Sequence, residues 1–307
     1  MDIPQSTTRF GVWIGALRLR TLPLALSSIS LGSFLAVFEN RFRLLVFILS
    51  ALTTICLQIL SNLANDYGDS VHGADSEKRK GPGRAVQQGL ISAGTMKKAI
   101  YVLIGLSLLS GISLLYISFG FNLKVFLGFF TVGILSILAA VSYTAGVKPY
   151  GYAGLGDIAV MLFFGFVGVM GVFYLHTGFI SPGYVLPAAT CGFFSVAVLN
   201  INNIRDIESD RQAGKKSLPV RLGRKKAITY HWILLVSGWL SALVFTWLNY
   251  TSAVQLVFIA SIPLFWRNAR AVAVTTDNSM LDPWLKQMAL STLLFVLLFG
   301  AGLILAQ

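Results

Sequence analysis

Seven long stretches of this chain contain no Asp, Glu, Lys or Arg, and this feature limits the possible folds more than any other. They cover residues 21–38, 44–65, 99–123, 125–147, 158–204, 227–266 and 287–307. A membrane-spanning helix needs ~20 apolar residues, so each stretch can cross a bilayer once and the two longest can cross twice. Hydrophobic residues make up 55% of the chain, and the mean hydropathy is +0.74. We therefore expect an all-α, polytopic membrane protein and not a water-soluble enzyme.

Turn-forming residues divide the two longest stretches. Ser181, Pro182 and Gly183 favour a tight bend in the middle of one, and residues 249–252 do the same in the other. The predicted result is nine transmembrane helices, at residues 21–39, 43–65, 98–120, 122–145, 157–177, 184–204, 227–248, 251–271 and 286–306. We expect a single integral-membrane domain over residues 1–307. Residues 1–20 lack the pattern of a signal peptide and are predicted to form a cytoplasmic or interfacial arm.

Basic residues fall mostly on one side of the predicted helices. If the N-terminus is cytoplasmic, only Arg41, Arg43 and Lys124 of the 24 Lys and Arg residues lie outside. Cytoplasmic loops of membrane proteins are enriched in Lys and Arg, so this distribution predicts a cytoplasmic N-terminus. The formal net charge of +12 is then explained by topology and by attraction to anionic lipid, and no nucleic-acid partner is expected.

Two acidic clusters close the second and sixth predicted helices, and they share a pattern. Each has an asparagine, an aspartate four residues later, and a second aspartate after a further three or four residues. The members are Asn62, Asp66 and Asp69 in the first cluster, and Asn202, Asp206 and Asp210 in the second. Residues with these spacings share one face of a helix. The recurrence predicts two four-helix repeats plus a ninth helix, with both clusters facing one cavity from the same side of the membrane.

The composition of the clusters indicates a metal-assisted diphosphate site. Carboxylates at membrane depth are costly unless they line a wet cavity, pair with cations or bind metal. Oxygen ligands without Cys or paired His suit Mg²⁺ better than Zn²⁺. A basic segment follows each cluster, residues 78–84 after the first and 211–224 after the second. Such segments alone are typical of cytoplasmic loops, but carboxylates beside Arg and Lys are how a site binds a diphosphate leaving group.

Three strings of residues resemble a known family. SNLANDYGD (61–69), YGYAGLGD (150–157) and LNINNIRDIESDR (199–211) resemble motifs of the UbiA superfamily of intramembrane aromatic prenyltransferases, and of its 1,4-dihydroxy-2-naphthoate polyprenyltransferase branch. The resemblance runs from Leu19 to the C-terminus. It implies a bacterial inner-membrane enzyme with its site facing the cytoplasm and Mg²⁺ as cofactor. Such an enzyme transfers a polyprenyl group, commonly octaprenyl, from its diphosphate to 1,4-dihydroxy-2-naphthoate with loss of CO₂, giving demethylmenaquinone.

The resemblance also implies roles for individual residues. The implied metal ligands are Asp66, Asp69, Asp206 and Asp210. Asp75 is an alternative to Asp69, because the family's first motif often places its second acid four residues after the first. The implied catalytic residues are these four aspartates with Asp157 and Tyr143. The implied substrate-binding residues are Asn62, Asn202, Arg84, Lys148, Arg205, Lys215, Arg221 and Arg18.

Some of these residues have a second interpretation. Asp157 begins the fifth predicted helix, where an N-cap is the alternative to a role in the reaction centre. Arg18 and Arg20 precede the first helix, where anchoring of the topology is the alternative to contact with a substrate anion. Phe163 and Phe164 are expected to pack or to face lipid, and no residue is assigned to a prenyl tunnel.

Other classes of protein share part of this pattern. A cation-coupled secondary transporter also combines repeated halves with intramembrane carboxylates, but its carboxylates tend toward the bilayer midplane and not toward the ends of spans. A phosphatidyl-type alcohol transferase concentrates its acids in one motif. Within the superfamily, transferases acting on 4-hydroxybenzoate, haem precursors or chlorophyll precursors remain alternatives, and only the branch-like strings distinguish them.

Overall fold

The computed structural model describes residues 8–71, 85–145 and 149–307, and this part of the chain is helical without any β-strand. Its elements are α1 (Arg9–Leu17), η1 (Leu19–Thr21), α2 (Leu22–Phe38), α3 (Leu44–Val71), α4 (Ala93–Phe119), α5 (Leu123–Ser142), α6 (Gly156–Val160), η2 (Met161–Gly171), α7 (Val172–Thr177), η3 (Pro182–Tyr184), α8 (Val185–Arg205), α9 (Ile207–Gln212), α10 (Leu218–Leu248), η4 (Ala253–Ser261), α11 (Ile262–Val274), η5 (Asn278–Leu281) and α12 (Asp282–Leu305). Among the described residues, nine helices or runs of helical segments are long and apolar enough to cross a membrane. The predicted all-α membrane fold with nine spans is confirmed.

The helices extend beyond the predicted spans at several ends. α3 continues to Val71, so Asp66 and Asp69 lie within the helix and not after it. α10 begins at Leu218, nine residues before the predicted start, with a break at Gly223, where φ is 76°. The expectation came from charge-free stretches, and a helix can continue past the bilayer into charged sequence.

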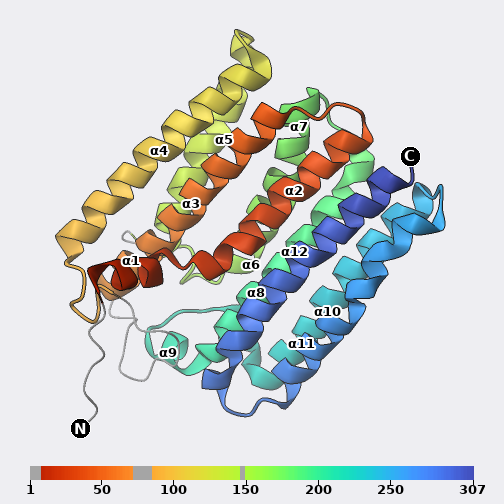
Figure 1. Ribbon diagram of the computed structural model, residues 1–307. Helices are drawn as coiled ribbons and strands as arrows, with labels where there is room; N and C mark the ends of the chain where they lie inside the picture. Colours follow the sequence, from red (N-terminus) through yellow and green to blue (C-terminus); the bar gives the residue numbers. More distant parts are fainter. Residues whose placement is uncertain (1–7, 72–84, 146–148) are drawn as a thin grey trace.

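The predicted N-terminal arm is a helix followed by a turn. Thr8 Oγ1 accepts a hydrogen bond from the Gly11 amide at 3.3 Å and caps the start of α1. Arg18 ends α1 in the left-handed region, with a φ of 49°. α1 packs on α3, where Ala16 is buried, and Figure 1 shows it lying across the end of the bundle.

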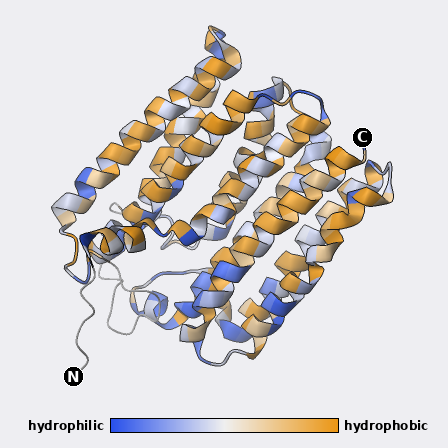
Figure 2. Ribbon diagram, viewed as in Figure 1, coloured by the Kyte–Doolittle hydropathy of each residue, from blue (hydrophilic) through white to orange (hydrophobic). Residues whose placement is uncertain are grey.

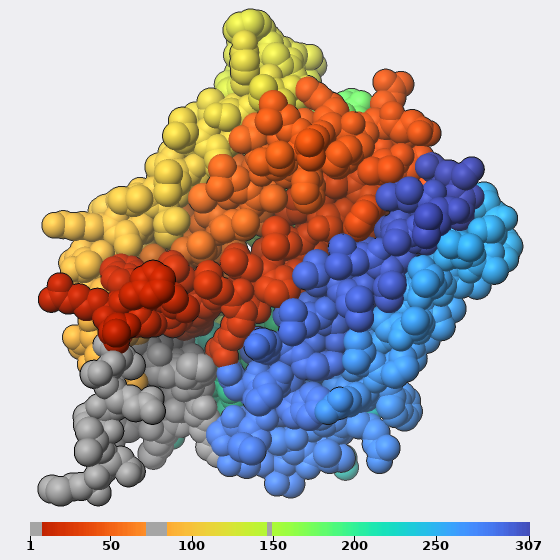
Figure 3. All heavy atoms as spheres, in the orientation of Figure 1, coloured from red at the N-terminus to blue at the C-terminus, as the bar shows by residue number. Residues whose placement is uncertain are grey.

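Contacts between the helices form two groups that α2 joins. α3 packs on α4 and α5, whereas α8 packs on α10 and η2, and α12 packs on α2, α8 and η4. α2 and α12 lie side by side (Figures 1 and 3). α2 packs on α3 of the first group and on α8 and η2 of the second, so the first span lies between the two groups and the ninth packs with the second. The relation between the halves as sequence repeats stays a prediction.

Hydrophobic residues dominate the lengths of the helices, and hydrophilic residues gather at the end of the bundle that carries α9 (Figure 2). α1 lies near that end and the C-terminus lies at the other, as an odd number of spans requires (Figure 1). The second group has an aromatic core that includes Phe194 and Phe295, whose ring centroids are 5.2 Å apart. The hydrophilic end is where both aspartate clusters lie.

Candidate active site

The first aspartate cluster lies on the last turns of α3 and is buried. Asp66 is 1% exposed and Asp69 is 3% exposed. The backbone amides of Ala85 and Val86 donate to the two Asp66 oxygens at 3.1 and 3.2 Å. The Tyr152 hydroxyl donates to Asp69 Oδ1 at 2.9 Å. Buried carboxylates need such donors, so two separate loops fold over the end of α3 to hold these charges.

Asn62 lies on the same helix, and its amide nitrogen bonds to the N-terminal segment. Its Nδ2 donates to the Leu17 carbonyl at 2.9 Å and to Thr21 Oγ1 at 3.0 Å. Its Oδ1 accepts from Gln58 Nε2 at 3.3 Å. Asn62 therefore ties α3 to the connection between α1 and α2, and these hydrogen bonds do not reach a carboxylate.

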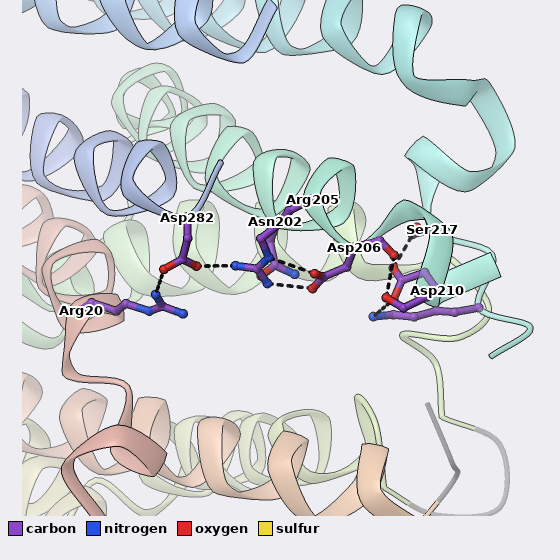
Figure 4. A network of polar contacts seen from close by, with 9 residues as sticks. Arg20, Asn202, Arg205, Asp206, Asp210, Ser217 and Asp282 are labelled. Carbon is purple, nitrogen blue, oxygen red and sulfur yellow. Dashed lines mark hydrogen bonds and ion pairs between the residues drawn. The ribbon is translucent and has the colours of Figure 1, made fainter. Parts of the chain in front are cut away.

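The second cluster lies where α8 ends and α9 begins, and Arg205 organises it (Figure 4). Arg205 Nε and Nη2 donate to the two Asp206 oxygens at 2.9 and 2.7 Å. Nη2 also donates to Asn202 Oδ1 at 2.8 Å. The side chains of Arg205 and Asp206 are only 2% and 6% exposed. This bidentate salt bridge is among the stronger hydrogen-bonded pairs in proteins, and it fixes the plane of the guanidinium.

Tyr152 and Lys215 connect the two clusters. Lys215 Nζ donates to Asp210 Oδ1 at 3.3 Å and lies 5.9 Å from the centroid of the Tyr152 ring. The hydroxyl of that ring holds Asp69 of the first cluster. Burial raises the pKa of Asp210. Lys215 opposes this pKa shift, and the charges of Asp206 and Asp69 add to it. The clusters of the two halves therefore face the same region around Tyr152 and Lys215, as the sequence predicts.

The loop between α5 and α6 packs closely on both halves. Thr144 Oγ1 donates to Asn65 Oδ1 at 2.9 Å. A Cβ at Gly68 would lie 2.6 Å from the carbonyl carbon of Thr144. A Cβ at Gly154, where φ is 82°, would lie 2.3 Å from the Lys216 carbonyl oxygen. Only glycine allows these approaches, which place the loop between the clusters.

Tyr143 lies beside this loop and is half-buried. Its ring packs edge-on against Tyr150, with centroids 5.3 Å apart. Burial raises the pKa of Tyr143, while Lys215 opposes that shift and three nearby carboxylates add to it. These carboxylates belong to Asp210, Asp69 and Asp157. Tyr143 is therefore within electrostatic reach of both clusters.

Asp157 lies in the first turn of α6, and its Oδ2 accepts a hydrogen bond from the Tyr230 hydroxyl of α10 at 3.3 Å. The N-cap of α6 is Leu155, so the N-cap interpretation of Asp157 is wrong. The chain begins α6 one residue earlier than the span predicted from sequence, which moves Asp157 inside the helix. Its predicted role in the reaction centre stays a prediction.

Two other predicted substrate-binding residues, Arg221 and Arg18, lie at the surface or partly buried. Arg221 is exposed, and its Nη2 donates to the Ala153 carbonyl at 2.7 Å. Arg18 is half-buried at the end of α1, and its carbonyl accepts from Thr21 Oγ1 at 2.9 Å. Three further predicted residues lie outside the described part of the chain. They are Asp75, Arg84 and Lys148.

Sequence reasoning missed Asp282, the first residue of α12. Its Oδ1 accepts from Arg205 Nη1 at 2.6 Å, and its Oδ2 accepts from Arg20 Nη1 (Figure 4). The available signal was an acid in a segment predicted to be cytoplasmic, which carries Asp277 as its one other acid beside Arg267, Arg270 and Lys286. Asp282 has no partner acid one helical turn away, so the spacing pattern of the two clusters does not include it.

The donor chemistry of the clusters fits Mg²⁺. All four aspartates offer oxygen, the ligand that this ion prefers. Among the described residues, no three Asp, Glu, His or Cys side chains form a preformed metal cage. Mg²⁺ commonly keeps several waters and shares one or two carboxylates with substrate phosphates, so a diphosphate site does not require such a cage.

A cavity of about 430 Å³ lies between α2, α3, α4, α5 and η2, and both Tyr143 and Tyr150 line it. Ser61 and Ser50 also line it, and their separation of eleven positions along α3 corresponds to ~16 Å of depth. Phe163 and Phe164 line the same cavity, and Phe164 also packs against the hydrophobic core, as expected. Hydropathy cannot distinguish a residue that faces lipid from one that lines an apolar cavity.

Comparisons with known proteins agree with this geometry. The sequence profile of the UbiA prenyltransferase family matches residues 25–293. The 1,4-dihydroxy-2-naphthoate octaprenyltransferase of Escherichia coli is 43% identical over 303 residues, which are 99% of this chain and 98% of the relative. The enzyme of the same name from Haemophilus influenzae is 46% identical over 295 residues, which are 95% of this chain and 96% of the relative.

Solved structures show the same fold at low sequence identity. The apo structure of a UbiA homologue from Aeropyrum pernix has a TM-score of 0.68 and 18% identity, covering 94% of this chain and 98% of that one. A UbiA homologue from Archaeoglobus fulgidus bound to DMAPP and Mg²⁺ has a TM-score of 0.61 and 18% identity, covering 95% and 98%. With the family profile spanning most of the sequence, the chain belongs to the UbiA prenyltransferase family.

Proposed function

We propose that this protein transfers an octaprenyl group from octaprenyl diphosphate to 1,4-dihydroxy-2-naphthoate, releasing CO₂ and diphosphate and yielding demethylmenaquinol. The observation that carries the proposal is that two buried aspartate clusters, linked through Tyr152 and Lys215, adjoin a deep apolar cavity. One part of this arrangement suits a diphosphate and the other suits a prenyl chain. The names of two full-length relatives support the choice of acceptor and of chain length.

Asp66, Asp69, Asp206 and Asp210 would hold Mg²⁺, which when bound neutralises the diphosphate and makes it a better leaving group. The fold homologue from Archaeoglobus fulgidus was solved with DMAPP and Mg²⁺, which supports Mg²⁺ as the ion. Asp75 remains the alternative to Asp69. Lys215 and Arg205 place further positive charge beside the carboxylates, and burial strengthens each of these interactions.

The apolar cavity supports the chemistry at the other end of the breaking bond. When the allylic C–O bond breaks, its electron pair leaves with the diphosphate and positive charge develops on the prenyl carbon. Tyr143 and Tyr150 line the cavity, and aromatic rings stabilise a cation placed over their faces. The electron-rich naphthoate ring then forms the new C–C bond, and the departing CO₂ leaves its bonding electrons to restore the aromatic ring. Exclusion of water prevents hydrolysis of the cation.

We further propose that residues 1–307 form one domain in the bacterial inner membrane, with the N-terminus and the site on the cytoplasmic side. The polar end of the bundle carries both clusters and the basic segments that follow the second, which supports this orientation. Relatives from bacteria support the choice of membrane.

The test is incubation of the purified protein with Mg²⁺, carboxyl-labelled 1,4-dihydroxy-2-naphthoate and a ladder of prenyl diphosphates, with mass detection of products. We expect one labelled CO₂ per prenylated product, a preference for the octaprenyl donor, and loss of activity on chelation that Mg²⁺ restores. Prenylation with the carboxyl retained, or turnover of 4-hydroxybenzoate alone, would contradict the proposed acceptor. Activity that persists in excess chelator would contradict the metal assignment.

A further inference from the structure

We infer that Asp282 is a positioning residue of the active site, which acts through Arg205 on Asn202 and Asp206. The inference rests on the proposed function, because it concerns the same site. Asp282 lies 76 positions after Asp206 in the chain, and only the fold brings it beside the second cluster. It also gives the ninth span a role in the reaction.

Every nitrogen of the Arg205 guanidinium is engaged. Nε and Nη2 donate to Asp206, and Nη2 also donates to Asn202. The remaining nitrogen, Nη1, donates to Asp282 Oδ1 at 2.6 Å. A guanidinium is planar and rigid, so anchoring Nη1 fixes the orientation in which the other two nitrogens meet their partners. Figure 4 shows Asp282, Arg205 and Asp206 in one line, with the guanidinium between the two carboxylates.

Asp282 also joins this arrangement to the N-terminal segment. Its second oxygen accepts from Arg20 of η1, so one carboxylate separates two guanidinium groups. The side chains of Arg20 and Asp282 are 26% and 28% exposed, whereas that of Arg205 is 2% exposed. The chain of alternating charges therefore runs from a partly solvated end at Arg20 to the buried end at Asp206. It links three elements, η1, α8 and α12, that are far apart in sequence.

Asp282, as a second counter-ion of Arg205, leaves Asp206 able to bind a divalent cation. A buried guanidinium needs negative charge nearby, and Asp282 supplies part of it from outside the cluster. Without Asp282, Arg205 depends on Asp206 alone and holds it against an incoming cation. With Asp282 present, Arg205 stays neutralised while Asp206 turns a lone pair toward a divalent ion. Partners of this kind, which orient a ligand without touching the metal, typically change metal affinity by ~10–100-fold when removed.

The test compares Asp282→Asn with Asp277→Asn, a matched control from the same segment whose Oδ1 accepts from the Ser279 amide. Mn²⁺ binding to each purified full-length protein, with inorganic diphosphate present, is measured by electron paramagnetic resonance. We expect Asp282→Asn to weaken Mn²⁺ binding about tenfold and to raise the Mg²⁺ concentration for half-maximal activity equally, with a smaller change in kcat. Asp277→Asn should match wild type, and Asp282→Glu should restore most of the affinity.

Equal Mn²⁺ affinities in wild type and folded Asp282→Asn would overturn the inference. If Asp282→Asn does not fold, Arg20→Gln decides, because it removes one partner of Asp282 without leaving a buried charge. We expect Arg20→Gln to weaken Mn²⁺ binding two- to threefold, and unchanged binding would overturn the inference. A wild-type protein that binds Mn²⁺ but forms no product from dihydroxynaphthoate contradicts the proposed function and leaves the role of Asp282 standing.

Discussion

The two aspartate clusters hold corresponding carboxylates by different means. Asp66 accepts from two backbone amides, and within the described part of the chain no Lys or Arg pairs with it. Asp206, in the corresponding place of the second cluster, accepts a bidentate pair of hydrogen bonds from Arg205. A carboxylate held by neutral amides keeps its charge for an incoming cation, whereas one held by a guanidinium already has a counter-ion. Asp66 thus offers its charge to a cation, whereas Asp206 belongs to a rigid and largely neutralised frame.

Asp206→Asn should have the largest effect, because this carboxylate serves both the site and the fold. It removes a proposed Mg²⁺ ligand, and it leaves the buried Arg205 with one counter-ion fewer, where breaking such a pair costs about 3–5 kcal/mol. We expect turnover to fall on the order of 10³-fold and the Tm in detergent to fall as well. Product formation and tryptophan fluorescence during heating measure the two effects. An unchanged Tm would show that Arg205 does not need Asp206 as a counter-ion.

Asp66→Asn sharpens the comparison, since it should reduce turnover to a similar extent with a smaller loss of stability. The asparagine oxygen can still accept from one of the amides of Ala85 and Val86, and no buried cation is left alone in the described part of the chain. We expect a rate loss on the order of 10³-fold and a smaller fall in Tm than for Asp206→Asn, because one buried amide loses its acceptor. A drop in Tm as large as that of Asp206→Asn would remove the distinction between the clusters.

Tyr152→Phe tests the connection between the clusters. It removes the hydroxyl that donates to Asp69 and keeps the ring beside Lys215. We expect turnover to fall about tenfold, as for other partners that orient a metal ligand. Tyr101→Phe is the matched control, because Tyr101 is 60% exposed on α4 and contacts neither cluster. Equal rates for the two variants would mean that the hydroxyl does not position Asp69.

Gly68→Ala should have the smallest effect on the chemistry and act mainly on stability. Its Cβ would lie 2.6 Å from the carbonyl carbon of Thr144, so α3 and the adjoining loop must separate, at a cost of about 1–3 kcal/mol. Gly105→Ala on α4 meets nothing within 4 Å and should leave the Tm unchanged or raise it slightly. If both variants have the same Tm, close packing on the loop does not support the first cluster.

The membrane fold and the place of the clusters could be predicted from sequence because the relevant signals are local. Charge-free stretches identify spans wherever they occur, and helical spacing identifies the acids that share a face. The positions of Asp66 and Asp206 at the same end of the bundle follow from counting spans between them. Even so, hydropathy missed that α3 continues through Asp69, because the helix extends into polar sequence.

The partners of the clusters could not be predicted, because they come from distant parts of the chain. Asp282 reaches Arg205 only through the packing of α12 on α8, and no spacing in the sequence records that contact. Nothing in the spacing of the sequence distinguishes Tyr152 from the other aromatic residues. Its role follows from the fold, which places it between Asp69 of α3 and Lys215. Phe163 illustrates the same limit, since lipid and a cavity impose the same apolar composition.

The central claim is that both clusters hold one diphosphate, and a double-mutant cycle tests it most directly. The affinity for inorganic diphosphate with Mg²⁺ is measured by calorimetry for wild type, Asp66→Asn, Asp206→Asn and the double variant. A shared site predicts strong coupling, so that the double variant binds little more weakly than the weaker single variant. Losses that multiply, as they do for independent and distant sites, would contradict the claim.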